Sequence, residues 1–340
     1  MRIRQTRRRV LSTLALGFAA PLVHLPRSYA DEQLETTTVR IFEGGGICVA
    51  PTFVADDLLR AEGFTDIRHV FSLDWRVDFT TQADFTAFFA SSLILQAAAG
   101  APFRVLTGLH VGCVELFAND SIRSIVDLKG KRVGVFARDG SPPYAFLSVM
   151  AAEVGLDPVK DIDWVVTPPP HSAEMLVAGK IDAMIGFPPQ SQELRDKKIG
   201  HVVVNSTVDR PWSDYFCCML MGSDEYIRKY PVATKRVVRA ILKAADLCTN
   251  EPTVIARQLV DGGYLVRSGF VGSAKDYDYT LQALQELPYD KWRDYDPEDT
   301  LRFYALRLRE AGLIKATPQQ IIADHADWRF LDELKRELKA

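Results

Sequence analysis

The residues best suited to binding a small molecule fall in turns that follow predicted strands. The run Glu43-Gly44-Gly45-Gly46 comes directly after the first of these strands. Glycines let a backbone turn tightly and bring its N–H groups close to a ligand. An ordinary flexible turn would have the same composition, and the place of this run after a strand favours the binding interpretation.

Aromatic residues mark a second candidate, Phe88-Phe89-Ala90-Ser91, which follows a short strand predicted at residues 83–87. Two adjacent phenylalanines in a loop are costly unless something flat or apolar covers one of them. The alternative is that both are buried in the domain. If one lines a cleft, we expect the ligand to have an aromatic or heterocyclic part.

The segment Gly140-Ser141-Pro142-Pro143-Tyr144 opens a predicted helix. A helix N-terminus with a serine hydroxyl suits a polar or anionic group. The two prolines lack N–H groups and so remove donors that a small inorganic anion would use. The segment therefore favours an organic ligand with one polar or anionic end.

Four other side chains are weaker candidates for the same ligand. Arg76 could pair with a carboxylate while Trp75 stacks beside it, although a surface salt bridge is the alternative. Phe187, followed by two prolines, either lines a site or belongs to a rigid turn. Tyr215 either packs in a core or lines the cleft.

The cysteine pattern predicts neither a metal site nor a cofactor. Five cysteines, at 48, 113, 217, 218 and 248, are expected to be buried as small hydrophobic residues. Cys217 and Cys218 are adjacent in a predicted strand, where neighbouring side chains point to opposite faces. No cysteine or histidine spacing is typical of zinc, and a Cys48–Cys113 disulfide cannot be deduced from the sequence.

Catalytic motifs are also missing from the sequence. We find no local Ser/His/Asp set, nucleophile elbow or phosphate-cradling loop. The sequence therefore predicts no catalytic residue.

Strand and helix patterns alternate through the first two thirds of the chain, which predicts an α/β fold with mostly parallel strands. Helical patterns dominate after residue 224. Strands are predicted at 38–42, 67–71, 83–87, 104–109, 132–136, 162–167 and 183–187, and helices at 49–62, 91–99, 144–154, 172–178, 225–248, 253–260, 274–287, 297–311 and 328–338. We expect Ser91 to cap its helix and Pro231 to separate a first turn from the rest of the helix at 225–248.

A short pattern occurs twice along the chain. Ala83-Asp84-Phe85 and Ile181-Asp182-Ala183 each place an aspartate at the start of a short predicted strand. A weak repeat of this kind predicts two similar lobes.

The first thirty residues have the pattern of an export signal. Thr6-Arg7-Arg8-Arg9 precedes an apolar run, residues 10–25, that is too short to span a bilayer comfortably. The pattern resembles a twin-arginine signal. We expect cleavage after Ala30 and a periplasmic protein; an N-terminal anchor is disfavoured because Pro21 and Pro26 interrupt the run.

Removal of this segment changes the charge of the chain. Residues 1–30 contain six arginines and no acidic residue, so the formal net charge would change from −3 to −9. An acidic chain argues against nucleic acid as a partner, because phosphate binding requires a basic surface.

The order of these motifs resembles that of the substrate-binding proteins of ABC importers, in the nitrate, taurine and alkanesulfonate group related to thiamine-precursor binders. The matching stretches are Val39-Arg40-Ile41 through Ala50-Pro51, Ala83-Asp84-Phe85 through Ala99-Gly100-Ala101-Pro102, Ile125 through Val135, Gly179-Lys180-Ile181-Asp182-Ala183 with Pro188-Pro189, and Tyr226-Ile227 through Pro231.

The resemblance implies a two-lobe type II periplasmic binding protein fold with a helical C-terminal part. Lobe 1 would comprise residues 36–116 and 214–340, and lobe 2 residues 117–213, joined by a hinge of two crossings. The ligand would lie between the lobes, and closure would be the signal read by a permease. Relatives commonly carry an acid before the proline that follows Phe187, and this chain does not.

The function implied by the resemblance is that of a monomeric, non-enzymatic receptor that delivers a small organic solute to an ABC permease and its ATPase. One alternative is an enzyme of the pyrimidine-precursor-synthase type on the same fold, a class that uses a histidine and a cysteine-rich segment. Only Cys217-Cys218 matches that segment, with no histidine nearby in the sequence. The other alternative is a sensory binding protein. Glu115 is placed near the first crossing, where a hinge role is expected.

Overall fold

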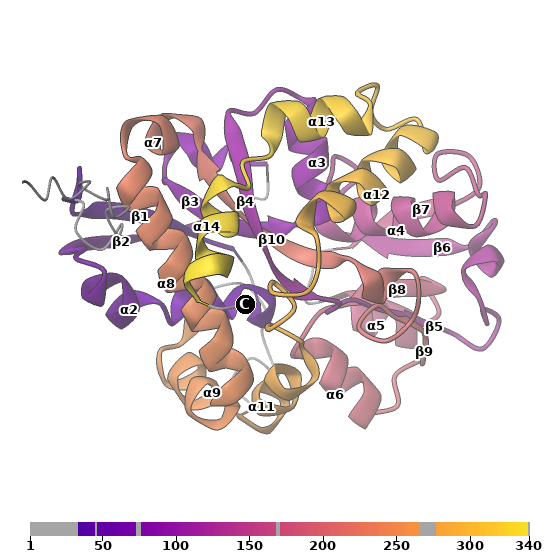
Figure 1. Ribbon diagram of the computed structural model, residues 1–340. Coiled ribbons are helices and arrows are strands. Elements are labelled where there is room, and N and C mark those ends of the chain that lie inside the picture. The colour runs from indigo at the N-terminus through magenta and orange to yellow at the C-terminus, as the bar shows by residue number, and fades with distance from the viewer. Residues whose placement is uncertain (1–32, 45, 73–75, 168–170, 265–276, 339–340) are drawn as a thin grey trace, which may run out of the picture. The chain divides into compact units, whose positions relative to one another are not determined.

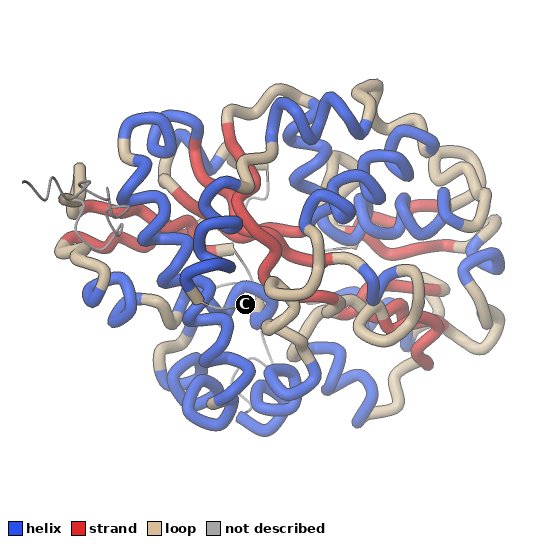
Figure 2. Tube along the Cα trace, in the orientation of Figure 1, coloured by secondary structure: helices blue, strands red, loops and turns tan. Residues whose placement is uncertain are grey.

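The computed structural model describes residues 33–44, 46–72, 76–167, 171–264 and 277–338. They form two α/β lobes, each built on a five-stranded sheet with helices packed against it (Figures 1 and 2). The strands are β1 (Thr38–Glu43), β2 (Asp66–Phe71), β3 (Phe85–Phe89), β4 (Phe103–Val111), β5 (Glu115–Ala118), β6 (Arg132–Val135), β7 (Asp163–Val166), β8 (Ala183–Gly186), β9 (His201–Asn205) and β10 (Phe216–Ser223).

The two sheets share one topology. The strand order is β2-β1-β3-β10-β4 in the first lobe and β7-β6-β8-β5-β9 in the second. Strands β2, β1 and β3 are parallel to one another, and β10 lies antiparallel beside β3. In the second lobe β7, β6 and β8 are parallel, and β5 lies antiparallel beside β8. The prediction of mostly parallel strands is therefore confirmed, with one reversed strand in each sheet. Strands β5 and β10 are reversed because they enter their sheets directly from the segments that cross between the lobes.

The helices of the described chain cover these sheets and form the C-terminal part (Figure 1). Helix α13 was not predicted, and Pro231 separates α7 from α8 as expected. The helices are α1 (Ala50–Phe53), α2 (Asp56–Ala61), α3 (Ala90–Ala98), α4 (Pro142–Glu153), α5 (Ser172–Val177), α6 (Gln190–Asp196), α7 (Asp224–Lys229), α8 (Pro231–Asn250), α9 (Pro252–Asp261), α11 (Tyr277–Glu286), α12 (Pro297–Glu310), α13 (Pro318–His325) and α14 (Arg329–Glu337).

The repeated aspartate has the same role in both lobes. Asp84 accepts hydrogen bonds from the backbone N–H and the guanidinium of Arg40, both at 2.7 Å. Asp182 accepts the equivalent bonds from Arg132, at 2.9 and 2.8 Å. The first pair joins β1 to the residue directly before β3, and the second joins β6 to the residue directly before β8, so the sequence repeat corresponds to a structural one.

Two predicted boundaries are wrong, and both affect the candidate site. The helix expected at 49–62 is broken at Val54 and Ala55 into α1 and α2. Strand β3 starts two residues later than predicted, so Phe88 and Phe89 are strand residues and not loop residues. Because β3 runs directly into α3, the N-cap is Phe89, and the expected cap from Ser91 does not form.

The chain passes between the lobes twice, over residues 112–114 and 206–215. The two crossings lie side by side: Val114 and Ser206 exchange two hydrogen bonds, each 2.9 Å long. A Cβ atom on Gly112 would lie 2.4 Å from Cα of Thr207, and Gly112 has a φ of 70°. Glycine is therefore required at this position.

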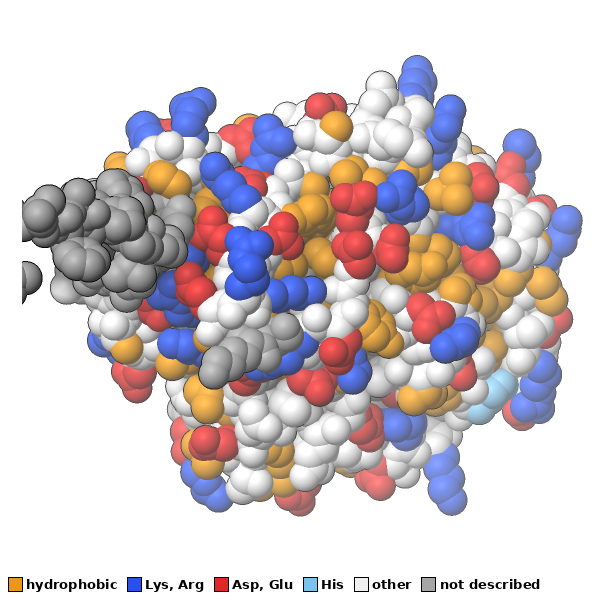
Figure 3. Space-filling model, viewed as in Figure 1, with side chains coloured by type: hydrophobic (Ala, Val, Ile, Leu, Met, Phe, Trp, Pro, Cys, Tyr) orange, Lys and Arg blue, Asp and Glu red, His pale blue; other side chains and the backbone are white. Residues whose placement is uncertain are grey.

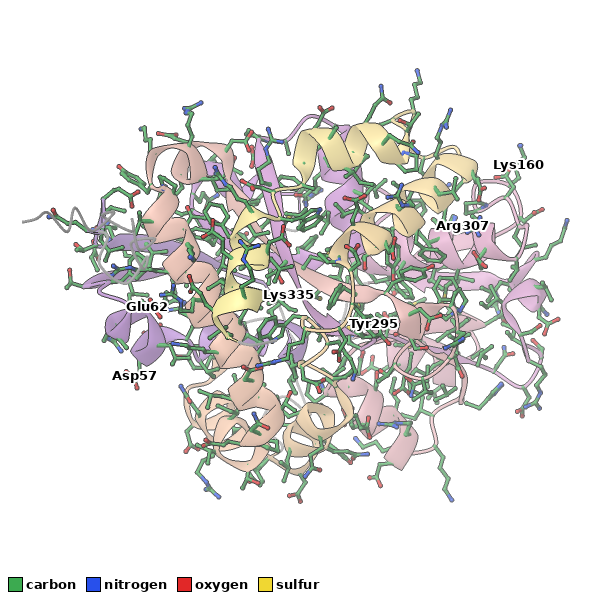
Figure 4. The ribbon with its side chains drawn as sticks, viewed as in Figure 1. Asp57, Glu62, Lys160, Tyr295, Arg307 and Lys335 are labelled. Carbon is green, nitrogen blue, oxygen red and sulfur yellow. The ribbon has the colours of Figure 1, made fainter. Side chains whose placement is uncertain are left out.

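The C-terminal helices contact both lobes. Helix α12 packs against α3 of the first lobe and α4 of the second, where Arg307 forms an ion pair with Glu153. Tyr295, which precedes α12, donates a hydrogen bond of 3.2 Å to the carbonyl of Ser213 in the second crossing. Figure 4 labels Tyr295 and Arg307 on this part of the chain.

The visible face of the molecule carries acidic and basic side chains that are interspersed with hydrophobic ones (Figure 3). Within the described residues, every helix is too short or too polar to cross a membrane.

Candidate functional site

Two phenylalanines at equivalent positions of the repeat meet between the lobes. Phe89 and Phe187 each lie five residues after the repeated aspartate of their own lobe. Phe89 ends β3, Phe187 follows β8, and their ring centroids are 5.2 Å apart in an edge-to-face arrangement. The carboxyl ends of β3 and β8 therefore face one another.

Two further phenylalanines extend this contact. Phe88 packs edge-to-face on Phe89 at 5.7 Å, and Phe136, directly after β6, lies 6.1 Å from Phe187. Phe88 is half-buried, whereas Phe89 and Phe187 are buried. Each lobe thus contributes two rings to one apolar cluster, which we call the aromatic cluster (Phe88, Phe89, Phe136 and Phe187).

A buried serine lies next to the aromatic cluster in each lobe. Ser91 is the second residue of α3, and Ser191 is the second residue of α6. Among the described residues neither hydroxyl has a hydrogen-bond partner, although both side chains are about 1% exposed. Buried hydroxyls are normally satisfied, so both are candidates for contact with a ligand.

Ser191 was not identified from the sequence. The sequence repeat could have identified Ser191, because α6 follows β8 in the second lobe as α3 follows β3 in the first. The intervening Pro188 and Pro189 make the spacing from the aspartate two residues longer in the second lobe, which hid the equivalence.

The glycine-rich turn begins at a buried ion pair. The carboxylate of Glu43 lies 3.0 Å from Nδ1 of His69, whose Nε2 lies 2.8 Å from the carboxylate of Asp56. Hydrogen bonds with Asp56 and with Glu43 raise the pKa of His69 to about 9. The charged imidazole thus holds the end of β1 against β2 and α2.

We expect this pair to make stability depend on pH. Because the folded-state pKa lies above the ordinary value of about 6.5, the contribution of His69 is complete below that pH and is lost as the pH rises toward 9. His69→Gln should therefore flatten the dependence of the free energy of unfolding between pH 6.5 and 9, measured by urea denaturation. The control is His171→Gln, which changes an exposed His–Glu pair. Parallel profiles for wild type and His69→Gln would contradict this assignment.

The glycines of the turn differ in what their backbone requires. Gly46 has a φ of 88°, a conformation that favours glycine. A Cβ on Gly44 would lie 3.6 Å from the carbonyl oxygen of Ala87 on β3, which is ordinary contact. Gly45 and Trp75 lie outside the described residues.

Polar contacts near the aromatic cluster also join the lobes. Arg76, which follows β2, lies 3.6 Å from the carboxylate of Asp139 in the second lobe. Ser92 of α3 donates a hydrogen bond of 3.3 Å to the carbonyl of Gly140. The predicted residues Arg76 and Gly140 are therefore both found where the lobes meet.

The other predicted residues make their contacts elsewhere. The hydroxyl of Ser141 donates to the carbonyl of Ala137 at 2.6 Å and so closes its own loop. Tyr144 packs on Trp164 at 5.0 Å, inside the second lobe, and Tyr215 stacks on Phe303 at 4.1 Å. Ala90 is buried at the start of α3.

Glu115 occupies the first position after the first crossing. Its carboxylate is buried, and burial raises its pKa to about 7, against the opposing effect of Arg195 3.7 Å away. Arg195 also binds Glu286 of α11 at 2.6 Å, which links α6 to the C-terminal part of the chain.

A cluster of thiols lies next to both crossings. All five cysteines are free, and all five are buried, as predicted. Cys113 lies in the first crossing, and its Sγ is 3.0 Å from Sγ of Cys217 at the start of β10. The ligand atoms of Cys48, His110 and Cys113 lie within 4.8 Å of one another, as do those of Cys113, Cys217 and Cys218. We call these five residues the thiol cluster.

The expectation that Cys217 and Cys218 point to opposite faces is wrong. The pairing of β10 with β4 shifts register between Phe216 and Cys218 and again before Met219. Such an irregularity interrupts the alternation of side chains, and both sulfurs reach Cys113. The sequence also gave no sign that His110 would lie beside cysteines, because the cluster draws on separate segments of the chain.

The four thiols of the cluster differ in acidity. Hydrogen bonds from Cys113 and from Cys218 lower the pKa of the Cys48 thiol. Burial raises the pKa of Cys217, but hydrogen bonds from the same two neighbours lower it, and the net shift is downward. Burial raises the pKa of Cys113 and Cys218. Cys48 and Cys217 are therefore the more acidic thiols.

Sequence comparisons connect part of the chain to importer proteins. Residues 115–259 match the model of the NMT1-like family. The chain is 23% identical over 225 residues, 64% of its length, to the nitrate import ATP-binding protein NrtC of Synechocystis sp. (strain ATCC 27184 / PCC 6803 / Kazusa). The match spans 32% of the length of that protein.

Comparison with solved structures identifies the fold. The periplasmic nitrate-binding protein NrtA from Synechocystis PCC 6803 superimposes with a TM-score of 0.70 over 91% of this chain and 90% of that one, at 15% identity. The chain has the fold of a periplasmic binding protein. The alkanesulfonate-binding protein SsuA from Xanthomonas axonopodis pv. citri has a TM-score of 0.66, with 87% of this chain and 100% of that one covered at 16% identity.

The same fold also occurs in an enzyme. The desulfurization enzyme DSZB has a TM-score of 0.58 and 16% identity, with 88% of this chain and 99% of that one covered. The predicted type II fold and the resemblance to the nitrate and sulfonate group are confirmed. Because one neighbour is an enzyme, the fold by itself does not decide between binding and catalysis.

Proposed function

We propose that this protein is a periplasmic solute receptor that binds one small organic molecule between its two lobes and delivers it to an ABC permease. The export pattern of residues 1–30 and the periplasmic neighbours support the location. The match to an import ATP-binding protein supports the type of partner. In this proposal the two crossings separate the lobes: lobe 1 comprises residues 36–111 and 216–340, and lobe 2 residues 115–205, so the predicted bound at residue 116 moves to the start of β5.

The observation that carries the proposal is the meeting of Phe89 and Phe187. They come from equivalent strand ends of two lobes that are joined by paired crossings. Ligands of open α/β sheets bind outside the carboxyl ends of the strands. A molecule held there would contact both lobes at once and so favour the closed arrangement.

The chemistry of the site indicates a ligand with a flat or apolar part and one polar end. The aromatic cluster supplies rings that stack on or edge against a planar group. The buried hydroxyls of Ser91 and Ser191 can each donate one hydrogen bond to a polar or anionic end. Helix α4 begins with Pro142 and Pro143, which lack the N–H donors that a small inorganic anion would need.

Receptor function is favoured over catalysis by the kind of groups that lie at the aromatic cluster. Phenylalanine rings and serine hydroxyls bind and orient a molecule, and the titratable pair next to them, Glu43 and His69, is already engaged in an ion pair. The predicted contacts Gly44, Gly45, Gly46, Trp75, Arg76 and Gly140 are part of the same proposal. Ser141, Tyr144 and Tyr215 stay in it as ligand contacts additional to their partners within the protein.

A thermal-shift screen tests the proposal. Small organic acids with aromatic or heterocyclic rings are added to the purified chain in parallel with nitrate, sulfate and aliphatic sulfonates. A ligand present at about 100 times its Kd stabilises the fold by about 2.7 kcal/mol, which should raise the Tm of a chain of this length by about 4 °C. We expect at least one ring-containing compound to do so and to remain chemically unchanged.

Two results would contradict the receptor. One is conversion of a stabilising compound into a product, detected by mass spectrometry of the incubated mixture. The other is stabilisation by inorganic anions alone, which would remove the role assigned to the phenylalanines.

A further inference from the structure

We propose that the thiol cluster binds one soft d¹⁰ metal cation, Zn²⁺ or Cu⁺, through Cys113 together with ligands from Cys48, Cys217, Cys218 and His110. Cys113 belongs to both groups of three donors whose atoms lie within 4.8 Å, so it is the ligand common to any arrangement. This site is separate from the aromatic cluster and does not depend on the proposed solute.

The type of donor selects the cation. Thiolate sulfur and imidazole nitrogen are the ligands of zinc and of Cu⁺, whereas Mg²⁺ and Ca²⁺ require oxygen. All five side chains are buried, and among the described residues the donors are four sulfurs and one imidazole. Closed sites with three or four ligands of this kind hold metal structurally.

The orientation of His110 fits a metal ligand. Its Nδ1 lies 3.3 Å from the carbonyl oxygen of Val111, so that nitrogen carries the proton and donates it. Its Nε2 is buried and, within the described residues, has no hydrogen-bond partner. A ligating histidine typically donates its other ring N–H to a carbonyl in this manner, which leaves Nε2 as an electron-pair donor.

The backbone also holds these donors in an unusual way. Cys113 has a φ of 104°, in a region that non-glycine residues rarely occupy. The register shift in β10 brings both Cys217 and Cys218 toward it. Strained positions and interrupted strands are concentrated at functional sites. Both irregularities here serve to bring sulfur atoms together.

A bound cation would connect the segments that join the lobes. Cys113 lies in the first crossing, Cys217 is the second residue of β10 after the second crossing, and Cys48 follows the glycine-rich turn. Binding exchanges thiol protons for metal–sulfur bonds, so protons are released to the solvent. Because the cation binds the folded chain, it should also raise Tm.

The test uses the full chain, freed of metal and fully reduced. We titrate it with Zn²⁺ and, in a separate anaerobic arm, with Cu⁺, and measure bound metal by equilibrium dialysis. Co²⁺ serves as a spectroscopic probe, because thiolate ligation gives intense charge-transfer absorption. We expect about one equivalent of Zn²⁺ or Cu⁺ per chain, an increase in Tm, and Co²⁺ absorption typical of thiolate ligands.

The variants distinguish ligands from structural cysteines. Cys113→Ser and His110→Gln should weaken binding by about 100-fold or more while circular dichroism shows a folded chain. Cys248→Ser is the matched control, because Cys248 is equally buried but lies on α8 and is not part of the cluster. It should bind metal as the wild type does.

Three results would overturn the site. The folded, reduced wild type could bind neither Zn²⁺ nor Cu⁺; Cys113→Ser could bind as tightly as wild type; or Cys248→Ser could weaken binding as much as Cys113→Ser. None of these results bears on solute binding, so failure of the metal site is distinguishable from failure of the receptor.

Discussion

Replacing Phe89 or Phe187 by leucine is expected to lower the affinity for the solute by about tenfold at each position. The leucine side chain keeps the site apolar but removes the ring and its edge-to-face contact. Such aromatic contacts contribute about 0.5–1.5 kcal/mol beyond simple burial, and about 1.4 kcal/mol corresponds to tenfold in Kd. Isothermal titration with the compound identified by the thermal-shift screen measures the effect.

The two substitutions should not be additive. Because the rings touch each other, the double variant should lose less affinity than the sum of the single effects, and the difference is their coupling energy. The control is Phe64→Leu, since Phe64 is buried in the core of the first lobe, between α2 and β2. It should lower stability and leave the affinity unchanged. Equal affinity losses in all three variants would show that the effect is general destabilisation.

The second large effect is expected on stability, at the repeated aspartate. Asp84 is buried, and Asp84→Ala leaves the partly buried backbone N–H of Arg40 without its acceptor and removes the partner of its guanidinium. Loss of a buried hydrogen-bond partner costs about 1–3 kcal/mol, more when a charged group is involved. We expect a decrease of about 3 kcal/mol in the free energy of unfolding, measured by urea denaturation.

A matched control for this prediction lies on β2. Asp66 binds Arg68 with the same two-bond geometry, at 2.6 and 2.9 Å, but on the exposed surface. Exposed ion pairs contribute little. Asp66→Ala should therefore leave stability nearly unchanged, and a loss equal to that of Asp84→Ala would contradict the importance of burial. Asp182→Ala, which removes the equivalent acceptor of the second lobe, should destabilise like Asp84→Ala.

Local patterns predicted most elements, because apolar spacing and capping residues are visible in a short window. Strand β1 and the helices α4 and α12 were located to within a few residues. The repeat of Asp84 and Asp182 predicted two similar lobes, since Asp84 bonds to β1 and Asp182 to β6, which have equivalent places in their sheets.

Features that depend on long-range packing were not predictable from the sequence. Strands β5 and β9 and helices α6 and α13 were missed. The aromatic cluster was found in part: Phe88, Phe89 and Phe187 were candidates, but Phe136 was not, because nothing local distinguishes it. Ser91 was expected as a helix cap and is instead a buried hydroxyl without a partner among the described residues.

The thiol cluster shows the same limit more strongly. Zinc motifs are recognised when ligands are close in sequence, but His110 and Cys113 meet Cys48 and Cys217 only through the fold. The register shift that turns Cys217 and Cys218 toward one partner arises from strand pairing, which no local pattern reveals.

Native mass spectrometry of the protein, released from cells without denaturation, identifies directly what the lobes hold. We expect the folded chain to carry one small, ring-containing organic molecule, and we expect the Phe89→Leu/Phe187→Leu double variant to carry less of it or none. A chain that carries only an inorganic anion, or one that carries the same molecule equally well in the double variant, would contradict this expectation.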